Sequence, residues 1–338
     1  SFKDALQMIW TFHLAVLNED AISGLSPGRV GQVLYPYWKR DISNGTLSRE
    51  ETLELLECMR VKFTTIDCFA SMGVVGGVLS GNTFNNLCLG GLLKDGSSAA
   101  NELEMLILEA GISCDTPQPT LSVLYDEKLP EEFLLKAVEC TKAGTGYPAW
   151  VNNQVAMEFL LDNYRHEGMT IEEARAWSIG GCLETSPGSW MPLELDGEVH
   201  WIPGGSAPAT SVGVHFLSLP KILETVIFDG MDMRTGGRIF PAHGRKLESW
   251  DEIRETFKDY FRRACHVLTL TNNIQHDAWR KISPSLVNSL LKPDCLKTGK
   301  DIGSMVCRYN TTFNIESCGT ANLINSLAAL KHNIFTEK

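Results

Sequence analysis

A cysteine and a glutamate stand two residues apart in a glycine-rich segment, at Cys182 and Glu184. Glycines before a thiol let the backbone enter a narrow space without a Cβ clash. Side chains two residues apart lie on the same side of an extended segment. A neighbouring carboxylate raises the pKa of a thiol, so such a pair does not favour a reactive thiolate. The pair suits chemistry in which the thiol keeps its hydrogen while the acid handles a separate proton.

Ten cysteines are scattered through the chain, without a Cys-x-x-Cys pair or a Cys/His cluster at zinc-ligand spacing. Most lie in apolar surroundings, where a buried thiol is the usual finding. So many unclustered thiols indicate a reducing compartment, and we expect a cytoplasmic protein. From the pattern alone, a structural and a catalytic role for Cys182 both stay open, and the other nine cysteines are expected to fill space.

Four further residues could contribute to a site, and each also has an ordinary structural explanation. His215 lies just before an expected helix and could be a hydrogen-bonded core histidine. Glu316 lies in an apolar-flanked segment, where a lone acid is costly unless paired, but it could also be a surface or capping acid. Ser23 in a loop and Phe84 in an apolar stretch could serve turn formation and packing.

The elements that must position these residues alternate between helix and strand. Two capping boxes, Ser48-x-x-Glu51 and Thr170-x-x-Glu173, predict helix starts, and the second helix is expected to reach about residue 177. Apolar spacing predicts further helices over 4–17, 33–38, 99–109, 131–141 and 153–164. Strands are expected over 84–90 and 119–125, and a Gly-rich turn leads into the segment 147–151. This order predicts an α/β fold with parallel strands, and one contiguous domain is favoured because no Pro-, Gly- or Ser-rich linker divides the chain.

Composition excludes several functions for the 338 residues. The net charge is −11, from 30 basic and 41 acidic residues, which argues against nucleic acid or an anionic membrane surface as the partner. Hydrophobic residues make up 43% and charged residues 21%, as in an ordinary globular protein. No run of 18 apolar residues occurs, so no transmembrane helix is expected.

The Gly-Gly-Cys-Leu-Glu run around Cys182 resembles the cysteine loop of the glycyl radical enzymes, which carry Gly-Cys-x-Glu. Other segments fit the same family in order and spacing. These are Ser26-Pro27-Gly28-Arg29, Asn101-Glu102-Leu103, Gly144-x-Gly146-x-Pro148, Asp229-Gly230-Met231-Asp232 and Ser326-Leu327-Ala328-Ala329-Leu330. The resemblance implies part of a ten-stranded α/β barrel with the Cys loop inside it. Residues 1–338 would form a single segment of that catalytic barrel domain.

Two positions narrow the resemblance within the family. Leu183 excludes the adjacent cysteine pair of pyruvate formate-lyase, and Thr185 replaces the Pro that diol dehydratases and the choline lyase usually carry after the Glu. The Cys-Leu-Glu-Thr-Ser-Pro-Gly run is most similar to the arylacetate decarboxylases. The resemblance therefore implies decarboxylation of 4-hydroxyphenylacetate to 4-methylphenol and CO₂ by a Cys thiyl radical.

The resemblance also implies the residues of the pocket, which are Ser23, Phe84, Cys182, Glu184, His215 and Glu316. Cys182 would carry the thiyl radical, and Glu184 would hold the substrate carboxylate and later help to move a proton. Glu316 would accept the phenol proton, with His215 orienting the hydroxyl. Phe84 would pack on the ring and Ser23 would donate a hydrogen bond.

The cofactor implied by the resemblance is a glycyl radical on a part of the chain outside this sequence, because the family's Arg-Val-x-Gly motif does not occur here. The family's substrate-binding Arg before Ser23 also has no counterpart. We therefore expect a fragment without the N-terminal part and the C-terminal glycyl radical domain, and with no metal bound by this segment. The implied partners are a small aromatic acid, a radical-SAM activating enzyme, a small iron–sulfur subunit and further copies in an oligomer.

Three alternatives stay open. A related decarboxylase could act on phenylacetate or indoleacetate, although His215 and Glu316 favour a para-hydroxyl because buried polar groups need partners. A C–O or C–N lyase of the diol dehydratase type would need a different polar ring around the substrate. A non-catalytic α/β subunit would leave Cys182 merely buried.

Overall fold

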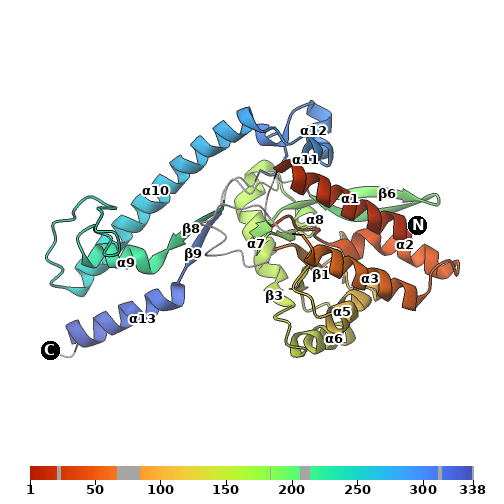
Figure 1. Ribbon diagram of the computed structural model, residues 1–338, viewed down its shortest axis with the longest axis horizontal. Coiled ribbons are helices and arrows are strands. Elements are labelled where there is room, and N and C mark those ends of the chain that lie inside the picture. Colours follow the sequence, from red (N-terminus) through yellow and green to blue (C-terminus); the bar gives the residue numbers. More distant parts are fainter. Residues whose placement is uncertain (21–23, 67–83, 183, 206–213, 311–313, 337–338) are drawn as a thin grey trace. The chain divides into compact units, whose positions relative to one another are not determined.

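The computed structural model describes residues 1–338 except 21–23, 67–83, 183, 206–213, 311–313 and 337–338. The chain divides into two compact units, and each is described by itself (Figure 1). The first unit comprises Ser1–Ser211 and Ser283–Thr311, and the second comprises Val212–Ile282 and Thr312–Lys338. The assignment of the whole chain to a single barrel domain stays a prediction.

A three-stranded parallel sheet forms the centre of the first unit, in the order β1 (Asn86–Gly90), β2 (Thr120–Tyr125) and β3 (Ala149–Asn152). Helices α5 (Glu102–Ser113) and α6 (Glu131–Lys142) connect these strands. Every residue of β1 is buried, as expected for a parallel strand covered on both faces. The predicted alternation of strand and helix, and the parallel pairing, are confirmed.

Among the described residues, the first unit contains six further α-helices besides one short helix that is described below. These are α1 (Phe2–Asp20), α2 (Val30–Ser43), α3 (Arg49–Thr64), α7 (Asn153–Tyr164), α11 (Leu286–Leu290) and α12 (Pro293–Thr298), with short 3₁₀ turns at Arg165–Glu167 and Ile302–Ser304. The capping box at the start of α3 is confirmed, since Ser48 Oγ accepts from the Glu51 backbone N–H at 3.1 Å and Glu51 Oε2 accepts from the Ser48 N–H at 2.8 Å.

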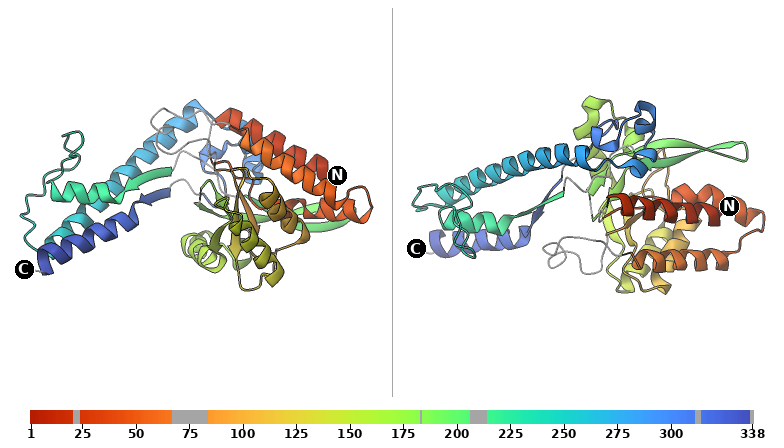
Figure 2. Two further views of the ribbon diagram at one scale, coloured as in Figure 1. Left: turned by 60° about the horizontal axis from the view of Figure 1, so that its bottom comes forward. Right: turned by 45° about the horizontal axis from the view of Figure 1, so that its top comes forward.

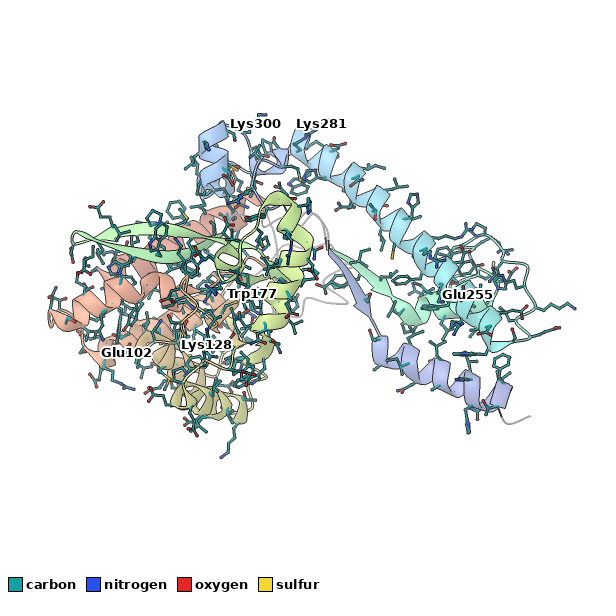
Figure 3. The ribbon with its side chains drawn as sticks, turned by 180° about the vertical axis from the view of Figure 1, so that it is seen from behind. Glu102, Lys128, Trp177, Glu255, Lys281 and Lys300 are labelled. Carbon is teal, nitrogen blue, oxygen red and sulfur yellow. The ribbon has the colours of Figure 1, made fainter. Side chains whose placement is uncertain are left out.

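The second capping box is also confirmed, but its helix α8 (Ile171–Ala174) is shorter than predicted. It ends three residues before the predicted end near residue 177, because the backbone bonds tighten after Ala174: the Ala176 N–H donates to the Glu173 carbonyl and the Trp177 N–H to the Ala174 carbonyl. Trp177 instead lies fully buried, and its indole N–H donates to Asn153 Oδ1 at 2.7 Å (Figure 3). Its aromatic side chain therefore fills the core where a further helical turn was expected.

The central sheet separates two hydrophobic clusters, because successive strand residues face opposite sides. Leu87 and Leu89 of β1 pack with the cluster that contains residues of α1, α2, α3, α5 and α6. Cys88, between them, packs with Trp177 and Ile179 in the second cluster. Cys88 therefore lies on the side of the sheet where the segment leading to Cys182 begins.

Four antiparallel strands follow α8 in the first unit. Strands β4 (Ser178–Gly180) and β5 (Glu184–Ser186) form one hairpin, and β6 (Gly188–Leu195) and β7 (Glu198–Gly205) form another. Among the helices of the described ranges, none has the length and apolar character needed to cross a bilayer.

In its described residues, the second unit combines a parallel strand pair with three α-helices (Figure 2). Strand β8 (Val214–Ser218) leads into α9 (Leu219–Ile227), which packs against the long helix α10 (Trp250–Ile282). Strand β9 (Asn314–Cys318) pairs with β8 and leads into α13 (Thr320–Leu330), which ends in a π-helical turn at Lys331–Thr336. Tyr260 of α10 and Leu323 of α13 lie in the shared core.

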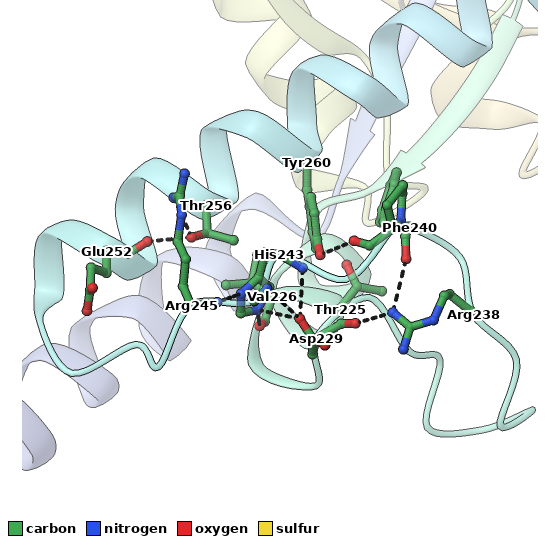
Figure 4. Close-up of polar contacts among 12 residues, drawn as sticks. Thr225, Val226, Asp229, Arg238, Phe240, His243, Arg245, Glu252, Thr256 and Tyr260 are labelled. Carbon is green, nitrogen blue, oxygen red and sulfur yellow. Dashed lines mark hydrogen bonds and ion pairs between the residues drawn. The ribbon is translucent and has the colours of Figure 1, made fainter.

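The loop between α9 and α10 is held by polar contacts (Figure 4). Asp229, in the left-handed region at φ +52°, accepts from the backbone N–H groups of His243 and Gly244 at 2.8 and 3.2 Å. His243 Nδ1 accepts from the Arg245 N–H, so Nε2 carries the proton and donates to the Val226 carbonyl at 2.8 Å. The Asp-Gly motif that starts this loop therefore has a structural role in joining α9 to the segment before α10.

Candidate active site

Cys182 lies in the turn of the β4–β5 hairpin. Gly180 pairs with Glu184 across the hairpin, and Gly181 adopts φ +59°, a conformation that favours glycine. The prediction that Cys182 and Glu184 share one side of an extended segment is wrong, because the chain reverses direction between residues 180 and 184. The tight turn, and not strand alternation, keeps the thiol and the acid in one local structure.

The two glycines before Cys182 allow close approaches, as their presence predicts. A Cβ at Gly181 would lie 2.7 Å from Glu184 Oε2, so the carboxylate packs directly over the residue before Cys182. A Cβ at Gly24 would lie 3.0 Å from the Gly181 Cα, so the loop at residue 24 runs against the same turn. Ser23 itself lies outside the described residues.

Buried contacts from β1 and from the start of α2 support the hairpin. The Ile179 backbone N–H donates to Cys88 Sγ at 3.2 Å, which joins β4 to β1. Arg29 is 3% exposed, and its guanidinium donates to the carbonyls of Arg175, Gly90 and Leu92 at 2.5, 3.1 and 2.9 Å. One side chain therefore holds both the end of β1 and the segment that enters β4.

Glu104 is a fully buried acid next to this network. Its Oε2 accepts from the Gly90 N–H at 2.9 Å, and its Oε1 accepts from Gln32 Nε2 at 3.4 Å. Burial raises the pKa of Glu104 to about 8, against the partly opposing effects of the Gly90 hydrogen bond and of Arg29. Burial likewise lowers the pKa of Arg29 to about 10 and raises that of the Cys88 thiol to about 11. At neutral pH the Glu104 carboxyl group is therefore mainly protonated.

Sequence reasoning did not identify Arg29 and Glu104 as support for the cysteine turn. The available signal was an acid in the apolar run Leu103-Glu104-Met105-Leu106. Asn101 caps α5 by accepting from the Glu104 N–H, and first-turn acids after such a cap are usually exposed. Only the packing of α5 against α2 and β1 turns this carboxyl group inward.

Phe84 precedes β1 and adopts φ +52°, which is uncommon for a residue with a bulky side chain. It is half-buried, and β1 begins two residues later. Strain of this kind costs on the order of 1–3 kcal/mol and occurs preferentially at functional sites. The strained conformation agrees with a functional role for Phe84. The contact of Phe84 with a substrate ring stays a prediction.

His215 and Glu316 lie on the neighbouring strands β8 and β9 of the second unit. The parallel register pairs His215 with Ile315 and Phe216 with Glu316, so the two candidates are offset by one position. Glu316 is half-buried, and the strand of His215 leads directly into α9 as expected. The structure thus brings this pair together on adjacent strands, and its convergence with Cys182 and Glu184 stays a prediction.

The expectation that nine cysteines fill space is only partly correct. Cys88, Cys140, Cys295 and Cys307 are buried, whereas Cys58 and Cys318 are exposed. Cys68 lies outside the described residues. In the ranges that the structure covers, no three His, Cys, Asp or Glu side chains gather in a way that could hold a metal ion.

Comparison with known proteins places the chain in a family. The model of the pyruvate formate lyase-like family matches residues 1–338. The chain belongs to that family. It is 55% identical over 338 residues to the 4-hydroxyphenylacetate decarboxylase glycyl radical subunit of Clostridioides difficile strain 630, and it covers 38% of that protein's length.

Two other relatives are more distant. An indoleacetate decarboxylase of Tractidigestivibacter scatoligenes is 35% identical over the whole chain, which covers 36% of it. The solved structure of hydroxyproline dehydratase from Clostridioides difficile, with trans-4-hydroxy-L-proline bound, matches 99% of this chain at a TM-score of 0.87 and 30% identity. The chain covers 40% of that structure. The predicted α/β fold of the glycyl radical enzymes is thereby confirmed.

Proposed function

We propose that the protein containing this chain is a carbon–carbon lyase that decarboxylates 4-hydroxyphenylacetate to 4-methylphenol and CO₂. The main support is the identity of 55% to the 4-hydroxyphenylacetate decarboxylase subunit against 35% to the indoleacetate enzyme. The Cys182–Glu184 hairpin agrees with this proposal, because it holds a half-buried thiol and a carboxylate within one tight turn.

The glycyl radical cofactor would supply the one-electron oxidation of the Cys182 thiol when the complete enzyme is activated. The turn suits this role, since Gly181, the residue before Cys182, leaves room for the Glu184 carboxyl group. Glu184 would hold the substrate carboxylate close to the sulfur. Phe84 would pack on the aromatic ring, and Ser23 would donate a hydrogen bond.

His215 and Glu316 would interact with the phenol hydroxyl of the substrate. As the substrate loses an electron to the sulfur, Glu316 would accept the phenol proton as a general base, with His215 orienting the hydroxyl. CO₂ then leaves, Glu184 passes a proton to the Cys182 thiolate, and the benzylic carbon takes a hydrogen atom from the resulting thiol, which restores the thiyl radical. The proton on Glu316 returns to the phenol oxygen, and Glu184 regains a proton from solvent. The register of β8 and β9 supports a joint role, because it places both residues on paired strands.

Assembly follows from the same proposal. The relative is named a glycyl radical subunit, which implies other subunits in its complex. We propose a small iron–sulfur subunit, a radical-SAM activating enzyme and an oligomer in the cytoplasm. A reducing compartment agrees with the many cysteines of the chain.

The test uses the full-length, activated enzyme with 4-hydroxyphenylacetate, phenylacetate and indoleacetate assayed side by side. We expect preferential formation of 4-methylphenol, loss of turnover with retained substrate binding in Cys182→Ser, and loss of turnover in Glu316→Gln. Preference for indoleacetate would overturn the substrate assignment and would indicate an indoleacetate decarboxylase instead. Product formation by Cys182→Ser would overturn the thiyl role.

A further inference from the structure

A small cavity lies against the base of the hairpin that carries Cys182. It has a volume of about 200 Å³ and lies entirely within the first unit. Ser178, Gly180 and Ser186 of the hairpin line one part, and Lys292 lines another. At roughly 30 Å³ per water molecule, a space of this size can hold a carboxylate with a few further heavy atoms.

The lining of this cavity carries positive charge. Arg29 and Lys292 contribute to it, and none of the described residues that line it is acidic. Taking a cation out of water is costly unless an opposite charge or several hydrogen bonds compensate it. The cavity therefore favours an anion on simple electrostatic grounds.

Lys292 has no hydrogen-bond acceptor or ion-pair partner among the residues that the structure describes. Lys292 is half-buried, and desolvation lowers the pKa of its ammonium group. The titratable groups that act on this pKa are the thiols of Cys307 and Cys295. Burial raises the pKa of both thiols, that of Cys307 to about 12, so they stay neutral and supply no negative charge. Lys292 thus lines the cavity, and within the described ranges its ammonium group has no counter-ion.

Arg29 has an incompletely satisfied guanidinium group. Its two terminal nitrogens donate to three carbonyls, but its buried Nε has no acceptor. The acid that acts on it is Glu104, which burial keeps mainly protonated at neutral pH. Arg29 therefore adds positive charge that this carboxyl group does not neutralise.

Serine hydroxyls add uncharged donors to the same lining. Ser26 Oγ accepts from the Asn86 N–H at 3.0 Å, which leaves its own hydrogen available to donate. Ser178 makes no side-chain hydrogen bond with the described residues. An ammonium group with nearby hydroxyl donors is a suitable set for one carboxylate, because charge-assisted hydrogen bonds are the stronger kind.

We propose that this cavity binds the carboxylate of a small acid, with Lys292 as its main partner and Ser26 and Ser178 as further donors. The bound anion would connect the base of the β4–β5 hairpin to the loop at residues 24–29 and to the start of α12. It would thereby restrain the turn that holds Cys182. The site does not depend on the decarboxylase reaction, because binding is measurable in protein that carries no radical.

The test titrates full-length, radical-free protein with ¹³C-labelled acetate and follows binding by NMR line broadening. We expect saturable binding with a dissociation constant on the order of 1 mM, weakened about 10-fold or more in Lys292→Met, which removes one charge-assisted contact. Lys292→Arg should retain binding, and Lys300→Met, at an exposed lysine of the same unit, should leave it unchanged (Figure 3). Unsaturable binding, or binding unaffected by Lys292→Met, would overturn the proposal.

A second measurement needs no variant. Acetate should slow reductive methylation of Lys292 in the wild-type protein, measured by peptide mass spectrometry, and leave Lys300 unaffected. Equal methylation rates with and without acetate would overturn the proposal even if Lys292→Met failed to fold. Displacement of labelled acetate by 4-hydroxyphenylacetate would identify the substrate's carboxylate as the occupant, and its absence would identify a separate small acid.

Discussion

The β4–β5 hairpin and the β8–β9 strand pair carry the two halves of the predicted pocket, but their surroundings differ. Beneath the hairpin lie fully buried partners, among them Cys88 and Arg29, which bond to backbone atoms before Cys182. In the part of the chain that the structure describes, the strand pair has two strands, and its Phe216, the register partner of Glu316, is 51% exposed.

Because of this difference, substitutions in the two regions should affect the stability and the activity of the protein differently. Around the hairpin, a substitution removes buried hydrogen bonds as well as altering the site, so stability and activity should change together. On the exposed side of β9, a substitution removes few buried contacts, so stability should hardly change. The following predictions test that contrast in full-length protein, which is radical-free except where turnover is measured.

The largest effect is expected for Arg29→Met. The variant removes the Arg29 donor from the carbonyls of Arg175 and Leu92, whereas the Gly90 carbonyl still accepts from Gln32 Nε2 at 2.9 Å. Each unsatisfied group costs about 1–3 kcal/mol, so the free energy of unfolding should fall by about 2 kcal/mol or more. Thermal melting measures this change. Arg254→Met, at an exposed arginine paired with Asp251 on α10, is the control and should change stability by less than about 1 kcal/mol. Equal losses of stability in the two variants would contradict the proposed difference between the buried surroundings of the hairpin and the exposed surface.

A pH dependence is expected from Glu104. The unfolded chain loses this proton near its ordinary pKa of 4.5, whereas the folded protein keeps it until about pH 8. Stability should therefore fall as pH rises between these values, by at most about 1.4 kcal/mol per pH unit. Melting temperatures of wild type and Glu104→Gln from pH 5 to 8 measure this slope, which the variant should lack.

Glu102→Gln is the matched control for that slope. Hydrogen bonding by Tyr35 lowers the pKa of Glu102 to about 2, so this acid is already ionised throughout the same pH range in both folded and unfolded protein. Its replacement should leave the slope between pH 5 and 8 unchanged. A slope that persists in Glu104→Gln would show that another group carries it.

A smaller loss of stability is expected for Gly181→Ala. Alanine at this position would have to adopt φ +59°, and its Cβ would lie 2.7 Å from Glu184 Oε2. This strain should lower the free energy of unfolding by about 1–3 kcal/mol. Hydrogen exchange of the hairpin should accelerate, and turnover of the activated enzyme should fall because the carboxylate must move. Gly144→Ala is the control, with positive φ but no atom within 4 Å of its Cβ. Equal loss of turnover in both variants would exclude the Glu184 contact as the cause.

The smallest effect is expected for Cys318→Ser on β9. This thiol is exposed, so its replacement should change the free energy of unfolding by less than about 0.5 kcal/mol. Cys88→Ser is the matched variant beneath the hairpin and should cost more, about 1–3 kcal/mol, because it places a hydroxyl in a fully buried apolar cluster. Similar melting temperatures for the two variants would contradict the difference between the regions.

Local patterns predicted much of the fold. The capping boxes at Ser48 and Thr170 and the apolar runs of β1 and β2 depend on neighbours within a few residues, so sequence spacing is enough to find them. The helix expected to reach residue 177 fails for the opposite reason. Trp177 is used by the core, and its partner Asn153 is 24 residues away.

The candidate site divides in the same way. Cys182 and Glu184 were recognisable because their residue types, their spacing and the flanking glycines all lie within one short segment of the sequence. The support from Arg29 and Glu104 was not, because it depends on contacts between β1, α2, α5 and the segment entering β4.

By itself, the sequence determined the α/β order of elements, the cysteine segment and the family resemblance, since all three depend on residue types and short spacings. Only the tertiary structure decided that the cysteine segment is a hairpin turn, that Glu104 is buried and mainly protonated, and that positive charge lines a cavity at the hairpin's base. These features depend on which distant groups exclude water from one another, and burial is a property of the assembled fold.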